Sequence, residues 1–169
     1  LGGPASRKRF DWALQVLQSC GRAELQLVAC GFSTSTVGAA RELVPPGLRE
    51  RVHFAPFLSN EQLLALYRGA GAVLYPTLYE GFGFPAIEAQ AAGVPVIFSP
   101  VSSLPELVGP LAFTPAVNDL AAWVHAVNQA LLLGPRRAGM ATHALRWAQG
   151  FSWAQSCERH LAVYRQAAA

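Results

Sequence analysis

Glu80 and Glu88 have the spacing of a ligand-binding pair. They bracket a glycine-rich segment that joins a strand-like run to a helix-like run. Two carboxylates separated by such a loop and one helical turn can hold two parts of one polyhydroxylated ligand. Gly81 and Gly83 let backbone N–H groups approach anionic oxygens, and the start of a helix adds partial positive charge there. The segment therefore predicts a site for a ligand that carries both hydroxyl and phosphate groups.

Chemically distinctive segments follow the predicted strands. In open parallel sheets, ligands bind outside the carboxyl ends of the strands, so we expect these segments to meet on one rim. They are Arg7-Lys8, residues 55–58, the loop that begins at Glu80, and residues 102–106. On this rim we expect Arg7 and Lys8 to neutralise a diphosphate. Pro56 and Phe57 are expected to form an apolar shelf for a base.

The loop after Glu80 and a pair of serines complete the predicted donor-binding set. Backbone N–H groups at the helix start would supply further donors to a diphosphate. Either glutamate would accept hydrogen bonds from sugar or ribose hydroxyls. The loop residues are Gly81, Phe82, Gly83 and Phe84, and the serines are Ser102 and Ser103.

Each of these residues also has a purely structural interpretation, which stays open at this point. Glu88 would then be a solvated first-turn glutamate, and the glycines would only form a turn. Ser102 and Ser103 would start a helix, with Glu106 completing a capping box. Phe57 would belong to the core, and the Arg-Lys pair would be exposed.

The elements that must position these residues alternate along the chain. Predicted helices cover residues 10–20, 37–44, 59–67 and 86–92, and predicted strands cover residues 25–30, 51–54, 72–75 and 94–98. Further helices are expected over about residues 119–167. Short strands that are apolar on both faces and separated by helices predict a parallel sheet covered on both sides. The predicted class is therefore α/β, with residues 1–169 forming one Rossmann-like domain.

Composition excludes several other functions. The chain has 169 residues, a net charge of +3 and no dense basic stripe, so we expect no nucleic-acid partner. The three cysteines and four histidines lack metal-ligand spacing, and the only aspartates are Asp11 and Asp119, so we expect no metal site. No apolar stretch approaches the roughly 18 residues of a membrane span. No Gly-x-Ser-x-Gly elbow or phosphate loop ending in Gly-Lys-Ser/Thr occurs.

Nearly the whole chain, from about residue 7 to residue 165, resembles the donor-binding half of family-four retaining glycosyltransferases. The most specific stretches are residues 76–85 (PTLYEGFGFP) and residues 101–106 (VSSLPE). Residues 151–153 (FSW) and 163–165 (VYR) resemble the terminal helix of that family. These enzymes have the GT-B fold, in which two Rossmann-like domains face each other across a cleft.

The resemblance implies a role for each matching residue. Glu80 would act at the catalytic centre and bind hydroxyls of the transferred sugar, whereas Glu88 would hold the ribose. Lys8 matches the phosphate-binding lysine of the family. Gly3 and Pro4 occupy the stretch where the family often carries an arginine, and the adjacent Arg7 would compensate. Subfamilies with an Arg-Lys pair lean toward GDP-mannose, which predicts a mannosyltransferase-like hexosyltransferase that uses GDP-mannose or a UDP-sugar, without a cofactor or metal.

The resemblance also implies a missing partner. The acceptor-holding N-terminal domain of the family is absent from these residues, and the first strand of the donor half is reduced to Leu1. We therefore expect a fragment that is inactive alone, with a gap or a substitute segment in its sheet. The expected location is cytoplasmic, at the inner membrane surface if the acceptor is lipid-linked. A non-catalytic nucleotide-binding or interaction module on the same fold is the alternative, and a sugar-nucleotide epimerase ranks below both.

Overall fold

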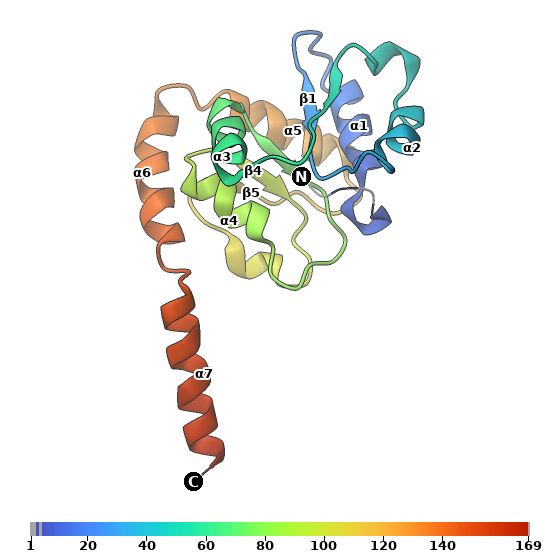
Figure 1. The fold of residues 1–169 in the computed structure, drawn as a ribbon. Coiled ribbons are helices and arrows are strands. Elements are labelled where there is room, and N and C mark those ends of the chain that lie inside the picture. The colour runs from blue at the N-terminus through green and yellow to red at the C-terminus, as the bar shows by residue number, and fades with distance from the viewer. Residues whose placement is uncertain (1–2, 4, 169) are drawn as a thin grey trace.

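A computed structural model describes residue 3 and residues 5–168 and shows helices alternating with short strands (Figure 1). The strands are β1 (Leu27–Ala29), β2 (Val52–Phe54), β3 (Val73–Tyr75), β4 (Val96–Phe98) and β5 (Ala112–Phe113). The α-helices are α1 (Phe10–Ser19), α2 (Val37–Glu42), α3 (Asn60–Gly69), α4 (Phe84–Ala91), α5 (Leu120–Leu131), α6 (Arg136–Ala148) and α7 (Trp153–Ala167). Short 3-10 helices cover Ser6–Lys8, Pro46–Leu48 and Leu104–Leu107. The predicted α/β class is confirmed.

The strands of the described residues pair only in parallel, but they form two sheets. β1 pairs with β2, and a separate sheet has the order β3-β4-β5. Within the described part of the chain, no pairing joins β1 to β3. The sequence predicted either a gap or a substitute segment in the sheet, and the described residues show a gap. The predicted remnant of that strand, Leu1, lies outside the described residues.

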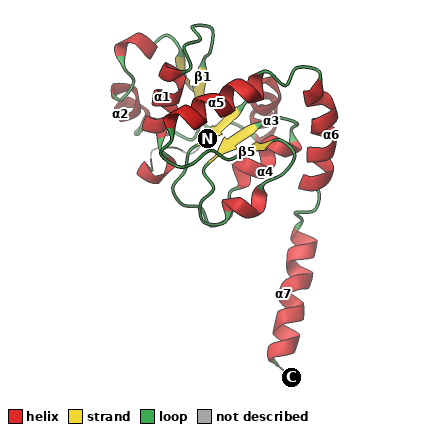
Figure 2. Ribbon diagram, turned by 180° about the vertical axis from the view of Figure 1, so that it is seen from behind, coloured by secondary structure: helices red, strands yellow, loops and turns green. Residues whose placement is uncertain are grey.

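Helices cover both faces of the three-stranded sheet (Figure 2). Successive side chains of a strand point to opposite faces, and β4 shows this alternation. Ile97 packs with Trp12 of α1 and Trp123 of α5. Val96 and Phe98 pack on the opposite face with side chains of α4 and with Ala148 at the end of α6. Both faces of β4 are fully buried, which explains its uninterrupted apolar sequence.

Side-chain caps fix the starts of three helices. Ser59 and Gln62 form both bonds of a capping box at the start of α3. Asp119 accepts a hydrogen bond from the backbone of Ala122 at the start of α5. Ser152 caps α7 by accepting from the N–H of Gln155. Strand β5 was not predicted, because its two residues are too few to show a pattern.

The C-terminal helices differ from the rest in burial. α6 packs against α4, whereas α7 projects away from the body and has no buried residue among those described (Figures 1 and 2). Among the described residues, no helix combines the length and the apolar character required to cross a bilayer.

Candidate functional site

The first helical turn of the chain lies against the loop that follows β3. The backbone N–H of Leu78 donates to the carbonyl oxygen of Arg7 at 2.8 Å. Arg7 Nη1 in turn donates to the carbonyl oxygen of Tyr79 at 2.7 Å, across 72 residues of sequence. Two of the segments that were expected to share one rim therefore meet at the carboxyl end of β3.

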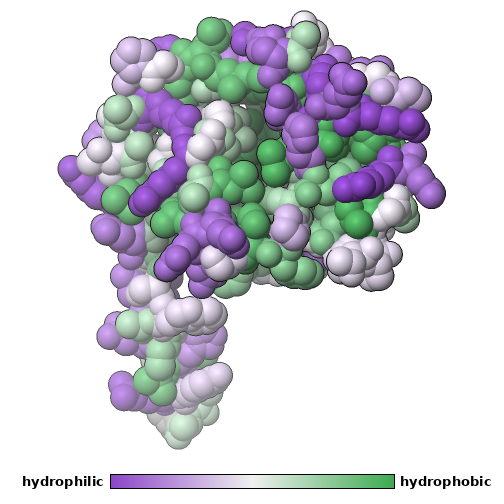
Figure 3. Space-filling view, turned by 45° about the horizontal axis from the view of Figure 1, so that its top comes forward, coloured by the Kyte–Doolittle hydropathy of each residue, from purple (hydrophilic) through white to green (hydrophobic). Residues whose placement is uncertain are grey.

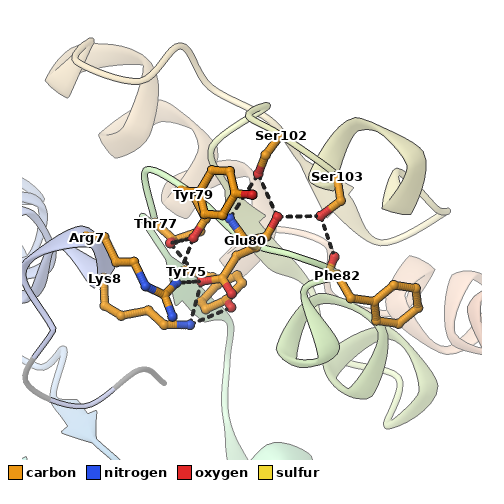
Figure 4. A network of polar contacts seen from close by, with 9 residues as sticks. All are labelled: Arg7, Lys8, Tyr75, Thr77, Tyr79, Glu80, Phe82, Ser102 and Ser103. Atoms are coloured by element: carbon orange, nitrogen blue, oxygen red, sulfur yellow. Dashed lines mark hydrogen bonds and ion pairs between the residues drawn. The ribbon is translucent and has the colours of Figure 1, made fainter.

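The carboxylate of Glu80 lies at the centre of a polar cluster (Figure 4). Its Oε1 accepts hydrogen bonds from Arg7 Nη1 at 2.8 Å, from Lys8 Nζ at 2.5 Å and from Thr77 Oγ1 at 2.8 Å. The hydroxyl of Tyr75 accepts a hydrogen bond from Lys8 Nζ at 2.9 Å. All three of the hydrogen bonds to Glu80 end on the same oxygen, Oε1, so the protein itself uses the acceptor capacity of that oxygen.

This environment favours the ionised form of Glu80. Burial alone would raise the pKa of its carboxyl group, but hydrogen bonds from Lys8, Thr77 and Tyr75 outweigh that effect. The positive charge of Lys8 acts in the same direction, so the pKa of Glu80 lies below its ordinary value. The site therefore presents a fixed negative charge that can accept hydrogen bonds from hydroxyl groups.

Two serines hold the backbone of the Glu80 loop. Ser102 Oγ accepts from the N–H of Glu80 at 2.9 Å and donates to its carbonyl oxygen at 3.0 Å. Ser103 Oγ lies 3.0 Å from the same carbonyl oxygen and 2.9 Å from that of Phe82. Ser103 makes no side-chain cap to the following 3-10 helix, so the capping-box interpretation is wrong. A contact of either serine with a donor remains a prediction, whereas their support of the loop is observed.

Helix α4 begins at the glycine loop, two residues earlier than predicted. Its N-cap is Gly83, with a φ of 105°, and Pro85 lies in its first turn, where a missing N–H costs little. A β-carbon at Gly83 would collide with the side chain of Leu104 and lie 3.1 Å from Leu107. Gly81, by contrast, has open space around it. The turn that leads into α4 therefore requires glycine at position 83.

Glu88 is exposed, as the structural interpretation expected, but it lies in the second turn of α4 and not in its first turn. Its carboxylate accepts a hydrogen bond from the hydroxyl of Tyr67 at 2.8 Å. Tyr67 belongs to α3 and is buried, so it fixes the position of an otherwise exposed acid.

Tyr75 links the two glutamates. Burial raises the pKa of its phenol, and the hydrogen bond with Glu80 and the negative charges of Glu80 and Glu88 raise it further. The negative charges of both carboxylates therefore act on the same buried phenol.

Two other predicted residues lie on a different part of the rim. Pro56 and Phe57 follow β2, which belongs to the two-stranded sheet. The side chain of Phe57 is 79% exposed, so its interpretation as a core residue is wrong. In the described part of the chain, neither residue joins the hydrogen-bond network of Glu80. Phe82 and Phe84 also reach solvent, with their rings 4.8 Å apart between centroids.

The sequence analysis missed three partners of the glutamates. Tyr67 and Thr77 are buried and donate from their hydroxyls to Glu88 and Glu80. Tyr75 is also buried, and its hydroxyl accepts from Lys8, the partner of Glu80. The available signal was polarity at the ends of elements, because Tyr75 ends a predicted strand and Thr77 follows it. Among the described residues, no group of three or more His, Cys, Asp or Glu side chains is placed to hold a metal ion.

Parallel strands, helices on both faces and a polar site at the strand ends define a Rossmann-like α/β domain. Residues 5–147 match the family described as Glycosyl transferases group 1. The chain belongs to this glycosyltransferase family.

Individual relatives agree with this assignment. The D-inositol 3-phosphate glycosyltransferase of Salinispora tropica is 38% identical over 125 residues, which cover 73% of this chain and 26% of that protein. A sucrose-phosphate synthase from Thermosynechococcus elongatus has a TM-score of 0.78 and 27% identity, covering 98% of this chain and 44% of that one. The fold of Anabaena HepE, solved in complex with UDP, is also similar, with a TM-score of 0.78 at 18% identity over 98% of this chain and 48% of that one. The chain thus spans about a quarter of the curated relative, 26%.

Proposed function

We propose that this domain binds a nucleoside-diphosphate sugar, and that the whole protein transfers the sugar to an acceptor hydroxyl with retention of configuration. The observation that supports this most is the cluster of Arg7, Lys8 and Glu80 beside the start of α4. It places cations suited to a diphosphate next to an ionised acceptor suited to sugar hydroxyls. The relative solved with UDP supports a nucleoside diphosphate as the common part of the donor.

The two cations keep hydrogen-bond donors for phosphate oxygens. Lys8 has three N–H donors, and within the described residues Glu80 and Tyr75 take two of them. Arg7 uses Nη1 for the Glu80 loop, and its side chain is 46% exposed. Its remaining guanidinium donors are suited to a bidentate phosphate contact. The diphosphate is therefore proposed to bind on the solvent side of this pair, near the first turn of α4.

Donor binding and the state of Glu80 are coupled in this proposal. Three protein donors converge on Oε1 of Glu80, so a sugar hydroxyl that binds this oxygen has to replace one of them. The side chain of Arg7 is 46% exposed, whereas that of Lys8 is 13% exposed. When the diphosphate draws the guanidinium of Arg7 toward itself, Oε1 of Glu80 becomes accessible to the sugar.

The same groups serve the proposed chemistry. The bond between the anomeric carbon and the phosphate oxygen breaks, which leaves negative charge on the diphosphate and positive charge on the sugar carbon. Lys8 and Arg7 stabilise the leaving group, and the ionised Glu80 is placed at the sugar. A charge-assisted hydrogen bond contributes about 1.5–3 kcal/mol, whereas a helix terminus contributes about 0.3–1 kcal/mol. The side-chain cations therefore outweigh the start of α4.

The remaining residues are assigned to the nucleoside. Glu88, fixed by Tyr67, binds the ribose hydroxyls, and the exposed Phe57 with Pro56 forms the shelf for the base. The sugar is proposed to be a hexose, carried by GDP as in GDP-mannose or by UDP. An acceptor-binding domain outside these residues completes the site, and a lipid-linked acceptor would place the protein at the cytoplasmic surface of the inner membrane.

A thermal-shift screen of this chain against UDP, GDP, ADP and the matching monophosphates tests the proposal. A ligand at 100 times its Kd stabilises the folded state by about 2.7 kcal/mol. We expect one or two diphosphates to raise the Tm and the monophosphates to do so much less. A chain whose Tm is unchanged by every diphosphate at millimolar concentration contradicts the proposal. The alternative, a non-catalytic module, predicts the same response to a diphosphate with and without its sugar.

A further inference from the structure

Arg137 binds the chain at the ends of two other helices. It lies in the first turn of α6, and its Nε donates to the carbonyl oxygen of Gly93 at 3.0 Å. Its Nη2 donates to the carbonyl oxygen of Ala70 at 3.2 Å. Ala70 is the C-cap of α3, and Gly93 lies directly after the C-cap of α4. One guanidinium group therefore joins segments that are 44 and 67 residues away from it in the sequence.

The two carbonyl groups, and not α6, explain the position of this arginine. The start of a helix carries partial positive charge, which disfavours a cation in the first turn. The ends of α3 and α4 carry partial negative charge and carbonyl groups without a partner inside the helix, and both suit a guanidinium group. Arg136 lies in the same turn of α6 and is exposed, so it provides a matched comparison.

The contact to Ala70 links α3 to the rest of this layer. α6 comes very close to the end of α4, because a β-carbon at Gly93 would lie 2.9 Å from that of Ala141. Among the described residues, α3 makes few close backbone contacts with α4 or α6. α3 borders an apolar groove of 530 Å³ through Leu66 and Gly69, and the space-filling view shows hydrophobic surface around a hollow on one face of the domain (Figure 3). The bond of Arg137 to Ala70 therefore helps to fix α3 relative to α4.

The two helices that Arg137 joins carry the Tyr67–Glu88 pair. Ala70 lies less than one helical turn after Tyr67, and Gly93 lies little more than one turn after Glu88. The hydroxyl of Tyr67 donates to Oε2 of Glu88 at 2.8 Å. Hydrogen bonds between two oxygens span about 2.5–3.0 Å, so a shift of α3 by about half an ångström is enough to weaken this one. The position of the exposed Glu88 carboxylate thus depends on how α3 lies beside α4.

We propose that Arg137 is a positioning residue of the donor site, because it holds α3 and α4 in the arrangement in which Tyr67 orients Glu88. It touches neither the donor nor the reacting atoms and acts through this pair. The inference rests on the proposed binding of the ribose by Glu88. It adds that Arg137 sets the preference of the site for a ribonucleotide over a nucleotide without ribose hydroxyls.

A double-mutant cycle in the chain without ligand tests the first part of the proposal. Tyr67→Phe removes the hydroxyl, and Arg137→Lys keeps a positive charge but loses the planar fork that bonds two carbonyl groups. We expect Tyr67→Phe to lower the Tm, and to lower it by less than half as much in the Arg137→Lys background. Arg136→Lys is the matched control and should leave the effect of Tyr67→Phe unchanged. Equal changes in the wild-type and Arg137→Lys backgrounds, including no change in either, overturn the positioning role.

Calorimetric titration with one nucleoside diphosphate and with its 2′,3′-dideoxy analogue tests the second part. The ratio of the two affinities cancels a general loss of binding, which a merely structural role would cause. We expect the wild type and Arg136→Lys to favour the ribonucleotide by roughly 10-fold or more, and Arg137→Lys to lower that preference at least about threefold.

The outcomes of this titration separate the inference from the function on which it rests. An unchanged preference in Arg137→Lys overturns the inference and leaves the proposed function standing. A wild-type chain that binds both nucleotides equally removes the ribose from Glu88 and overturns the inference together with that assignment. A wild-type chain that binds neither nucleotide contradicts the proposed function itself, and the inference about the ribose with it.

Discussion

Lys8 and Glu80 are 72 residues apart in the chain, yet their side chains form an ion pair with Nζ 2.5 Å from Oε1. Both side chains are largely buried, with exposures of 13% and 10%. Removing one member of a buried pair leaves an uncompensated charge, which costs more than the loss of a surface pair. The geometry of the proposed donor site therefore depends on the position of the 3-10 helix that carries Lys8 against the loop after β3.

Replacing Lys8 should weaken diphosphate binding strongly. We expect Lys8→Ala to raise the Kd for the preferred nucleoside diphosphate roughly 10- to 100-fold, because one charge-assisted hydrogen bond is lost. Isothermal titration calorimetry measures the change. Arg49→Ala is the matched control, since Arg49 is an exposed cation outside the Glu80 cluster and its loss should leave the Kd unchanged. An affinity that Lys8→Ala leaves unchanged removes Lys8 from the diphosphate site.

The folded state should lose stability in acid through Glu80. Its pKa in the folded protein lies below the ordinary value of 4.5, so the folded state binds fewer protons than the unfolded state. The stabilisation is therefore complete above about pH 4.5 and is lost as the pH falls through the lower, folded-state pKa. Urea unfolding at pH 7 and at pH 3 measures this effect. Between these pH values the free energy of unfolding should fall less for Glu80→Gln than for the wild type. The exposed Glu50→Gln should retain the wild-type slope.

The Glu80 loop depends on a serine in an unusual backbone conformation. Ser102 has a φ of 46°, and its hydroxyl bonds both backbone groups of Glu80. We expect Ser102→Ala to lower the free energy of unfolding by about 1–2 kcal/mol, because two hydrogen bonds disappear. Ser102→Gly loses the same bonds but tolerates the positive φ, so thermal melts should show a smaller loss. Equal losses would mean that the backbone conformation carries no strain.

The two loop glycines should respond differently to alanine. Gly83→Ala places a β-carbon against Leu104 at a φ of 105°, and we expect it to cost at least about 1–3 kcal/mol. Gly81→Ala meets open space, and a loss within about 0.5 kcal/mol is expected. Chemical denaturation of the two variants provides the comparison. Similar losses would show that the loop conformation does not depend on Gly83.

The fold could largely be predicted because local signals agreed with one another. Apolar runs such as residues 94–98, and caps such as Ser59 with Gln62, marked most elements within a few residues. Residues 112–113 showed no such signal, because their pairing depends on the neighbouring strand β4. The gap beside β1 was expected only from the resemblance to a family, not from any pattern in the residues.

The sequence predicted which residues lie near one another at the site, but not which side chains bond to one another. Glu80, Arg7 and Lys8 were placed on one rim because strand ends converge in a parallel sheet, and the structure brings them together. That the cations bond Glu80 itself was not predicted, because side-chain pairing across 72 residues follows from packing and not from spacing. The hydroxyls of Tyr67 and Thr77 were missed for the same reason.

The direct test of the central claim is calorimetric titration of the wild-type chain and Glu80→Gln with one nucleoside diphosphate and with its sugar conjugate. If Glu80 binds the sugar while the cations bind the phosphates, the variant should lose roughly 10-fold in affinity for the conjugate and far less for the bare diphosphate. Equal affinity changes for the two ligands, or no change for either, would contradict the assignment of this acidic cluster to a sugar nucleotide.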